Sequence, residues 1–383
     1  MAKTSLASAI AFLAGLSVAP ASEPVTIGMM APLSGSSAVL GQHMRDGARL
    51  ALSALGGRIA GRSVAFILVD DESDPDLAIA RARALLEREA ADILTGVASL
   101  DMMAALSDSA IFVGAPAAAS TIARRRCAAS FFSMSGREDR THQIMGAYAA
   151  RQGYARVALI ALDDPSGPSA VAAFQRGYGV EVADIALAKP DDADFANTLA
   201  GIASSAIDAL YAVAPGRAGV TLVRQFHEAA LKDAIVFLSA STIDETMSQA
   251  AGDAALDLVG AAHWAPDLDN AANRAFVAGF ENAFGYPPSI HAARSYDAIN
   301  LIASGVETVD GDLADADALR AALADADFNS VRGAFAFGAD QFPIQDLHLV
   351  AAVERADGAF VTSARSMLAR AGNQSDSAAC SAN

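Results

Sequence analysis

The sequence predicts an α/β protein of two lobes, each a doubly wound parallel sheet with helices on both faces. Two observations predict this fold. Short apolar strands alternate with amphipathic helices over residues 25–115, and the same alternation starts again over residues 156–239. The 383 residues, 53% hydrophobic and 19% charged, are too apolar for a disordered chain and, at about 150 residues per domain, correspond to about two and a half domains.

The first repeat supplies the strands and helices expected in lobe one. Proline beside a helix start is tolerated because the first turn has no hydrogen bond to lose, and Pro75 therefore marks where one helix begins. Parallel strands are expected because a helix joins each strand to the next. The predicted strands are 25–30, 63–69, 92–97 and 110–115, and the predicted helices are 41–55, 76–89 and 100–107.

The second repeat has the same pattern, whereas the last third of the chain departs from it. The repeat predicts strands at 156–162, 181–188, 209–213 and 235–239, with helices at 169–178, 195–205 and 218–231. The last third predicts an extended segment at 256–265, helices at 270–284, 289–306 and 316–324, and strands at 331–337 and 347–353 around a turn at 338–345. We expect the chain to return to lobe one and then cross back.

The first 21 residues have the pattern of a secretory signal peptide. Lys3 is followed by the apolar run 5–18 and by the small residues of Ala19-Pro20-Ala21. As a helix this run would be about 21 Å long, too short for the ~30 Å hydrocarbon core, so a permanent anchor is disfavoured. We expect cleavage after residue 21 and a soluble periplasmic protein without a lipid anchor.

Two cysteines would then lie in an oxidising compartment. Cys380 belongs to a polar tail, residues 366–383, that we expect to be flexible, and Cys127 follows three arginines. A disulfide between the two is one interpretation, and two unpaired thiols are the other.

Composition and motifs disfavour several classes of function. The formal net charge of −17 repels phosphate backbones and anionic lipids, so nucleic acid is not an expected partner. None of the lysines, Lys3, Lys189 and Lys232, follows a glycine, so the GxxxxGK[ST] phosphate loop is absent. HExxH, CxxC and GxSxG motifs are also absent, and the six histidines are scattered. We therefore expect no metal, no cofactor and no catalytic activity.

Short motifs in a set order resemble one known family, from residue 25 to about residue 360. The chain is similar to the periplasmic substrate-binding proteins of ABC importers, in their leucine/isoleucine/valine-binding branch. Each motif is weak alone, but their order and spacing together are specific. They are Pro32-Leu33-Ser34-Gly35, Gly56-Gly57-Arg58-Ile59-Ala60-Gly61-Arg62, Asp70-Asp71-Glu72-Ser73-Asp74-Pro75, Ala115-Pro116-Ala117-Ala118-Ala119, Arg294-Ser295-Tyr296-Asp297-Ala298 and Phe342-Pro343-Ile344-Gln345-Asp346.

The resemblance implies a type I binding-protein fold, in which three crossings join two lobes that enclose a ligand. The crossings would fall near residues 133–137, 261–267 and 331–336. Lobe one would combine residues 24–135 and 265–331, and lobe two would combine residues 136–264 and 332–365. The implied function is to capture a small-molecule carboxylate and to deliver it to an inner-membrane ABC permease, as a monomer.

The resemblance places a carboxylate at a helix start and at a neighbouring loop of lobe one. Ser99 precedes the predicted helix 100–107, so its hydroxyl and the N–H groups from Leu100 onward could hold an anion. An ordinary capping serine is the alternative. Ala117, Ala119 and Ser120 follow a strand end, where ligands of open sheets bind. The family has threonine at the place of Ala119, and Ser120 could replace it or be a turn serine.

On lobe two the sequence departs from the amino-acid binders. Ser241 stands where they carry an acid for the ligand's ammonium group, and Ser166 and Pro215 stand at the places of tyrosines. Enclosing an ammonium without a countercharge costs several kcal/mol. Unless Asp244 or Glu245 turns inward, an acid without an amine, such as an aromatic acid, fits better than an amino acid.

Four further residues are candidate ligand contacts. The resemblance places Leu40 and His291 around the ligand's tail, although a lone histidine is more often satisfied by its own protein. Arg137, at the first crossing, could reach an anion or belong to a solvated hinge cluster. Trp264, the only tryptophan, could be a pocket wall or plain packing.

Two other function classes are alternatives to the solute receptor. A ligand-sensing regulatory ectodomain of the same fold would need a signalling partner, and we expect no fused signalling domain from the patterns of this sequence. A hydrolase on an α/β scaffold would need a nucleophile and a base, and neither is visible as a motif. The solute receptor is therefore the leading interpretation.

Overall fold

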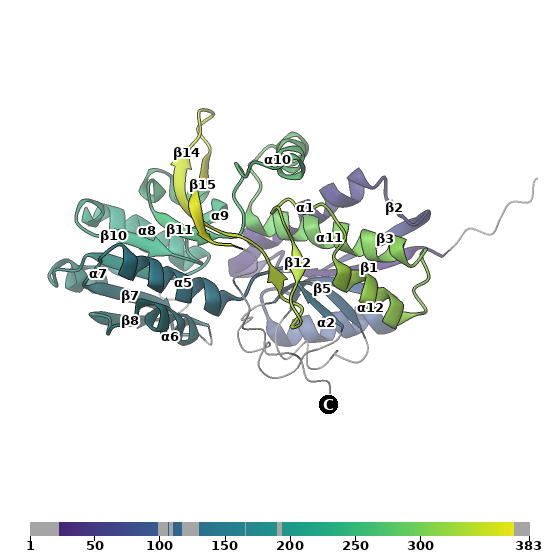
Figure 1. The fold of residues 1–383 in the computed structure, drawn as a ribbon, viewed down its shortest axis with the longest axis horizontal. Coiled ribbons are helices and arrows are strands. Elements are labelled where there is room, and N and C mark those ends of the chain that lie inside the picture. The colour runs from purple at the N-terminus through teal and green to yellow at the C-terminus, as the bar shows by residue number, and fades with distance from the viewer. Residues whose placement is uncertain are drawn as a thin grey trace, which may run out of the picture.

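The computed structural model describes residues 23–98, 106, 110–116, 130–164, 166–189 and 194–370. Two sheets lie end to end along the molecule, and helices cover both faces of each sheet (Figure 1). The predicted α/β fold of two doubly wound lobes is confirmed. None of the helices in this described part of the chain combines the length and the apolar character that crossing a lipid bilayer requires.

The lobe-one sheet has the order β2-β3-β1-β4-β5-β6. Its strands are β1 (Val25–Ala31), β2 (Arg58–Ile59), β3 (Arg62–Asp70), β4 (Ile93–Ala98), β5 (Ile111–Pro116) and β6 (Phe131–Ser133). Helices α1 (Ala38–Ala54), α11 (Ile290–Thr308) and α12 (Ala316–Asp325) pack on one face, and α2 (Pro75–Glu87) packs on the other. The last third of the chain therefore does return to lobe one.

Local sequence explains the central strand of this sheet. Along β1, Ile27 and Met29 face the α1 and α11 side, whereas Met30 faces the α2 side, as the two-residue period of a strand requires. A Cβ at Gly28 would stand 3.0 Å from two leucine methyl groups. Glycine at this position therefore lets α2 pack closely against the sheet.

The lobe-two sheet has the order β15-β14-β11-β10-β9-β7-β8. Its strands are β7 (Val157–Leu162), β8 (Asp184–Ala188), β9 (Ala209–Val213), β10 (Val236–Ser239), β11 (Val259–Ala262), β14 (Leu347–Glu354) and β15 (Phe360–Ala369). Helices α5 (Glu138–Arg151) and α6 (Gly167–Tyr178) cover one face, and α7 (Ala196–Ala203), α8 (Arg217–Glu228) and α9 (Glu245–Ala251) cover the other. Short 3₁₀ turns are η1 (Gly35–Ser37), η2 (Leu231–Asp233) and η3 (Gly252–Ala255).

The C-terminal region differs from the prediction of a hairpin between strands at 331–337 and 347–353. Strand β14 pairs antiparallel with β11 and β15, while β12 (Ala336–Phe337) pairs only with β13 (Pro343–Ile344). The prediction missed β15, whose residues are mostly half-exposed along an edge and show no clear apolar alternation. Because β15 runs to Ala369, the expected flexible tail cannot begin at residue 366.

The third crossing also lies later than the predicted 331–336. Phe335 and Phe337 pack against the lobe-one core, and Phe342 packs with the lobe-one helix α2. The chain therefore leaves lobe one only after Phe342 and enters β14 at Leu347. These phenylalanines were visible in the sequence, but which lobe buries them depends on tertiary packing.

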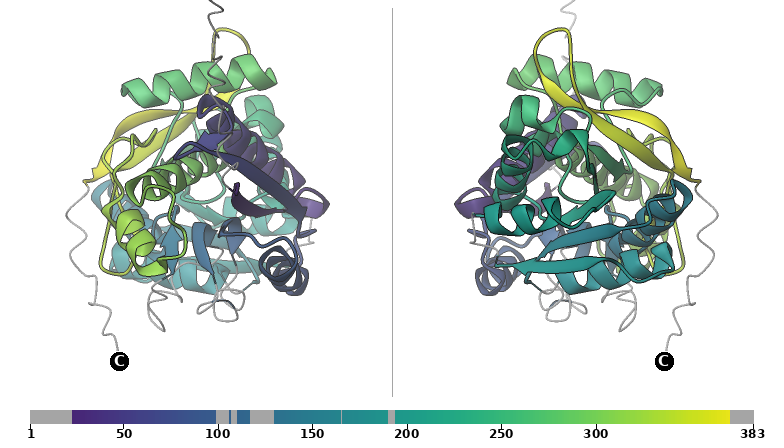
Figure 2. Two further views of the ribbon diagram at one scale, coloured as in Figure 1. Left: turned by 90° about the vertical axis from the view of Figure 1, so that its right-hand side faces the viewer. Right: turned by 90° about the vertical axis from the view of Figure 1, so that its left-hand side faces the viewer.

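Two contacts tie the C-terminal hairpin to lobe one. The tip of β14 and β15 reaches toward α10 (Ala271–Phe284), as Figures 1 and 2 show. There the Arg355 guanidinium pairs with Glu281 of α10 at 2.5 Å. Ser363 of β15 donates a hydrogen bond to Asp267, between β11 and α10, at 2.7 Å.

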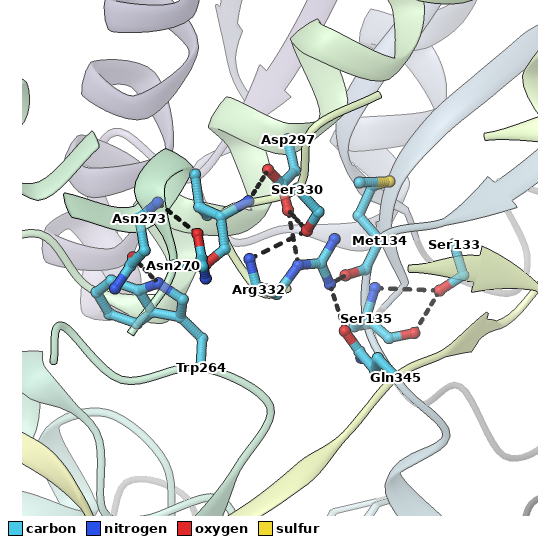
Figure 3. A network of polar contacts seen from close by, with 11 residues as sticks. Ser133, Met134, Ser135, Trp264, Asn270, Asn273, Asp297, Ser330, Arg332 and Gln345 are labelled. Carbon is cyan, nitrogen blue, oxygen red and sulfur yellow. Dashed lines mark hydrogen bonds and ion pairs between the residues drawn. The ribbon is translucent and has the colours of Figure 1, made fainter. Parts of the chain in front are cut away.

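A buried arginine ties the chain together where it passes between the lobes (Figure 3). Arg332 Nε donates to Asp297 Oδ2 of α11 at 2.9 Å, and Nη1 donates to the Met134 carbonyl at 2.6 Å and to Gln345 Oε1 at 3.1 Å. The Asp297 carboxylate also accepts the hydroxyl of Ser330 at 2.6 Å. Arg332 therefore joins the first crossing, the third crossing and α11 in one network.

Candidate functional site

A cavity of about 190 Å³ lies between the lobes. Each lobe contributes polar and charged side chains to its wall, as well as apolar ones. Lobe one contributes Leu40 of α1 and Ile290, His291 and Arg294 of α11; the lobe-two wall includes Glu138, Thr141 and His142 of α5, Ser166, Pro215, Ser241, Asp244, Glu245, Ala261 and His263. Enclosed interlobe spaces with a few convergent polar groups are typical small-molecule sites.

Arg294 places a positive charge in the cavity wall. No acidic side chain in the described part of the chain forms an ion pair with it. Its Nε atom is buried and has no hydrogen-bond partner there. Burial, together with the nearby Arg332 charge, lowers the pKa of Arg294 to about 10, although Glu138, Asp244 and Glu245 act in the opposite direction. The guanidinium stays charged at neutral pH and can bind a carboxylate through two parallel hydrogen bonds.

Two of the three acids in the cavity wall, Asp244 and Glu138, differ in their hydrogen bonding. Asp244 caps α9, and although burial raises its pKa, hydrogen bonds from His291, Thr246 and Met247 outweigh that effect and leave the pKa lowered. Glu138 has no hydrogen-bond partner among the described residues and is exposed to the space between the lobes. Protein atoms surround that space, so desolvation raises the pKa of Glu138. Glu138 is therefore free to accept a hydrogen bond from a ligand.

The start of α9 contacts the start of α11 across the two lobes. Glu245 Oε2 accepts the Ile290 N–H at 2.9 Å, and Oε1 accepts the hydroxyl of Thr362 on β15. Beside them, His291 Nε2 lies 3.4 Å from Asp244 Oδ2. Because Glu245 and Asp244 belong to lobe two and α11 to lobe one, these contacts hold the lobes together at the rim of the cavity.

The Glu245 contact predicts a pH dependence of stability. Burial, and next the Asp244 charge, raise the pKa of Glu245 from 4.5 to about 7. A carboxyl with a raised folded-state pKa contributes stability that is complete below its unfolded pKa and is lost as the pH rises through its folded pKa. The Tm of the wild type should therefore fall relative to that of Glu245→Gln as the pH rises from 4.5 to about 7.

Differential scanning calorimetry of both proteins across this pH range measures the effect. Well above pH 7 the Glu245 carboxyl is ionised in both the folded and the unfolded state, so the difference in Tm should become constant only there. Parallel Tm curves over the whole range would contradict the assignment of the titrating group to Glu245. Ligand should be absent from these scans, because its binding would add its own pH dependence.

Four residues proposed from the sequence line the cavity together. They are Leu40, Ser166, Ser241 and His291. The Ser241 hydroxyl is buried without a hydrogen-bond partner in the described structure, whereas the Ser166 hydroxyl donates to Asp164 Oδ1 at 2.7 Å. Ser241 is therefore the one of the two serines whose hydroxyl remains available to a ligand.

Arg137 and Trp264 do not lie in the cavity wall. Arg137 pairs with Asp139 at 3.2 Å and with Asp340 at 3.6 Å, which is the hinge cluster that its sequence neighbours suggested. Trp264 is 0% exposed, and its Nε1–H donates to Asn273 Oδ1 at 2.7 Å. The geometry favours packing for Trp264 and hinge pairing for Arg137.

Other sequence-based candidates fall outside the described residues. This group consists of the expected carboxylate-binding positions Ser99, Leu100, Ala117, Ala119 and Ser120. Cys127 and Cys380 also lie outside the described ranges. Their proposed roles stay predictions. Among the residues that the structure does describe, no group of three or more His, Cys, Asp or Glu side chains is arranged to hold a metal ion.

Several residues of the cavity wall were not predicted from the sequence. Arg294 lies three residues after His291 on α11, so helical spacing from a proposed contact could have found it. In the same way, Glu138, Thr141 and His142 share one face of the first turn of α5, a helix that was not predicted. His263 carried no local signal, because its position beside the cavity depends on the path of the chain after β11.

Comparison with known proteins agrees with this architecture. A family model described as periplasmic binding protein matches residues 24–359. The chain belongs to this family. Its members are named for binding rather than for catalysis, and the resemblance seen in the sequence motifs is confirmed.

Three relatives illustrate the similarity. The Leu/Ile/Val-binding protein BraC3 of Rhizobium johnstonii is 26% identical over 327 residues, which cover 82% of this chain and 87% of the relative. A solute-binding protein of an R. palustris ABC transporter, solved with benzoate, is 30% identical, with a TM-score of 0.82 and coverage of 91% of this chain and 97% of that one. An ABC transporter substrate-binding protein from Sphaerobacter thermophilus is 26% identical, with a TM-score of 0.81 and coverage of 90% and 98%.

Proposed function

We propose that this binding protein is the extracytoplasmic receptor of an ABC importer and that it captures a small carboxylate in the interlobe cavity. The observation that carries the proposal is Arg294, a cavity-lining guanidinium whose Nε lacks a hydrogen-bond partner in the described structure. A bound carboxylate would supply both the missing acceptor and the countercharge. The R. palustris relative was solved with benzoate, and BraC3 is named for leucine, isoleucine and valine.

The cavity favours an acid without an amine over an amino acid. The family resemblance places at Ser241 the acid that pairs with a ligand's ammonium, and Ser241 offers only a hydroxyl to the cavity. Neither neighbouring acid is free to replace that carboxylate, because Asp244 is held by His291 and Thr246 and Glu245 is held by Ile290 and Thr362. The Glu138 carboxylate remains free to accept a hydrogen bond from a ligand, including one from an ammonium group. The ligand test must therefore include amino acids.

The proposal includes location and partner. Residues 1–21 would direct secretion and be removed, and the closed protein would present its ligand to a permease in the inner membrane as a monomer. Closure follows from ligand contacts that exist only when both lobes meet. Mass spectrometry of protein recovered from the periplasm should find Ser22 as its first residue, and an intact Met1 would contradict cleavage.

A ligand panel tests the proposed function. Benzoate, 4-hydroxybenzoate, leucine and valine are compared by thermal shift, with neutral benzamide as the control for the carboxylate. At about 100 times Kd a ligand stabilises the folded state by about 2.7 kcal/mol, so a true ligand should raise Tm clearly and benzamide should not. Stabilisation by leucine or valine alone would show that the interpretation of Ser241 is wrong. Absence of any shift with a folded protein would overturn the proposal.

A further inference from the structure

Two buried histidines line the cavity, and their hydrogen bonds differ in kind. His142 of α5 contacts the hydroxyl of Tyr211 on β9, with 2.5 Å between Nδ1 and Oη. His263, after β11, contacts the Asp346 backbone carbonyl through Nδ1 at 2.9 Å. Both histidines line the same cavity. The partner of Nδ1 determines which nitrogen carries the hydrogen, and therefore what Nε2 offers to a ligand.

Tyr211 holds His142 in the form that carries its hydrogen on Nε2. Tyr211 is 0% exposed, and its hydroxyl has no acceptor other than His142 Nδ1 among the described residues. A buried hydroxyl hydrogen without an acceptor would be costly, so Tyr211 donates and Nδ1 accepts. Burial lowers the pKa of His142 to about 4, so the ring is neutral at pH 7. His142 therefore presents a neutral N–H donor from Nε2.

His263 has the opposite arrangement. A carbonyl oxygen can only accept, so Nδ1 of His263 must carry the hydrogen that it donates to Asp346. Burial, with the charges of Arg294 and Arg332, lowers the pKa of His263 to about 3, and the neutral ring has a lone pair on Nε2. A Cβ at Gly136 would lie 2.5 Å from that Nε2 atom, so glycine at this position leaves the imidazole room.

We propose that His142 and His263 together recognise a hydroxyl group on the bound carboxylate. This inference rests on the proposed function, in which Arg294 binds the carboxylate end. His142 Nε2–H donates to the hydroxyl oxygen, and the hydroxyl hydrogen is donated to His263 Nε2. A hydroxyl both donates and accepts, so it satisfies both histidines. An ammonium cannot accept from His142, and an apolar group leaves both nitrogens unpaired.

The expected consequence is discrimination between ligands that differ by one hydroxyl. Sites built to hydrogen-bond a hydroxyl reject analogues that lack it, because buried polar groups are left unpaired. We expect the wild type to bind 4-hydroxybenzoate at least ~100-fold more tightly than benzoate. His142→Phe should remove about tenfold or more of that preference, because the N–H group that the ligand hydroxyl accepts from is gone.

Isothermal titration calorimetry of the mature full-length chain with both acids measures these values. His227→Phe is the matched control, because His227 lies on the exposed side of α8 and should leave both affinities unchanged. Equal affinity of the wild type for the two acids would overturn the inference while leaving carboxylate capture intact. Equal weakening of both acids by His142→Phe would do the same. If no acid of the ligand panel binds, both the inference and the proposed function fail.

A second measurement does not depend on any variant folding. Nitrogen-15 NMR of the imidazoles in the ligand-free wild type reports which nitrogen carries the hydrogen. We expect opposite tautomers, with Nε2–H at His142 and Nδ1–H at His263. The same tautomer at both histidines, or a charged ring at pH 7, would overturn the inference. In Tyr211→Phe, His142 should no longer be held in the Nε2–H tautomer, because this variant removes the positioning hydroxyl without touching the ligand.

Discussion

Replacing Asp297 by alanine is expected to lower the free energy of unfolding by about 3–5 kcal/mol, because it leaves a buried guanidinium without its countercharge. The Asp297 and Arg332 side chains are both 0% exposed, and Nε and Oδ2 are 2.9 Å apart. The same carboxylate accepts the Val331 N–H at 3.0 Å and the Ser330 hydroxyl at 2.6 Å. Urea unfolding of both proteins measures the difference.

The Asp297–Arg332 pair lies where the chain passes between the lobes, so Asp297→Ala should affect more than the residues around it. Arg332 also donates to the Met134 carbonyl at 2.6 Å, so the network in Figure 3 spans two of the three crossings between the lobes. Losing Asp297 should therefore loosen the hinge as well as the lobe-one core. A fall in the m-value or a second transition would show that the lobes no longer unfold together.

Two variants make the Asp297 prediction specific. Asp269→Ala removes an acid from an ion pair with Arg274 whose side chains are 96% and 62% exposed, and such a pair contributes at most about 1 kcal/mol. The double variant Asp297→Ala/Arg332→Met should be less destabilised than Asp297→Ala alone, since no charge is left buried. A loss below about 1 kcal/mol for Asp297→Ala would contradict the prediction.

Replacing Arg294 by methionine is expected to weaken carboxylate binding strongly without destabilising the ligand-free protein. Removing one partner of a buried charge pair costs about 2–5 kcal/mol, which is about 30-fold or more in Kd at 1.4 kcal/mol per tenfold. In the ligand-free protein the guanidinium is disfavoured, because burial lowers the pKa of Arg294 to about 10. We therefore expect the Tm of ligand-free Arg294→Met to equal or exceed that of the wild type.

Two measurements test the expected Kd and the expected Tm. Calorimetric titration with the acid of the ligand panel that binds most tightly gives Kd, and thermal unfolding without ligand gives Tm. Arg274→Met is the matched control, since Arg274 is largely exposed and pairs only with Asp269 among the described residues. Its Kd should match the wild type. An unchanged Kd in Arg294→Met would remove Arg294 from the site, and a large fall in its ligand-free Tm would show that its role is structural.

Regular secondary structure was largely predictable from the sequence because its patterns are local. The alternation of Ile27 and Met29 with Met30 indicates a strand whose two faces are both covered, and the structure shows β1 at the centre of its sheet. Strand β15 was missed because it is an edge strand with half-exposed residues. The third crossing was misplaced because Phe335 and Phe337 have no local sign of which lobe buries them.

The candidate site was predictable only in outline. The family resemblance placed Leu40, Ser241 and His291 beside a ligand, and all three line the cavity. It did not single out Arg294 or His263, which come from elements of different lobes and meet only when the two lobes pack together. Their chemistry also depends on contacts distant in sequence, such as the hydrogen bond between His263 and Asp346, which are 83 positions apart.

The sequence by itself determined the α/β repeats and the membership of the family, because periods of 2 and 3.6 residues and the order of short motifs are properties of neighbouring residues. Only the tertiary structure decided which charges remain for a ligand. The sequence alone does not distinguish the roles of Arg294 and Arg332, because both are arginines. In the structure Asp297 neutralises Arg332, while the Nε of Arg294 has no acceptor among the described residues. The physical reason is that a buried cation is structural or functional according to the partner that folding brings to it.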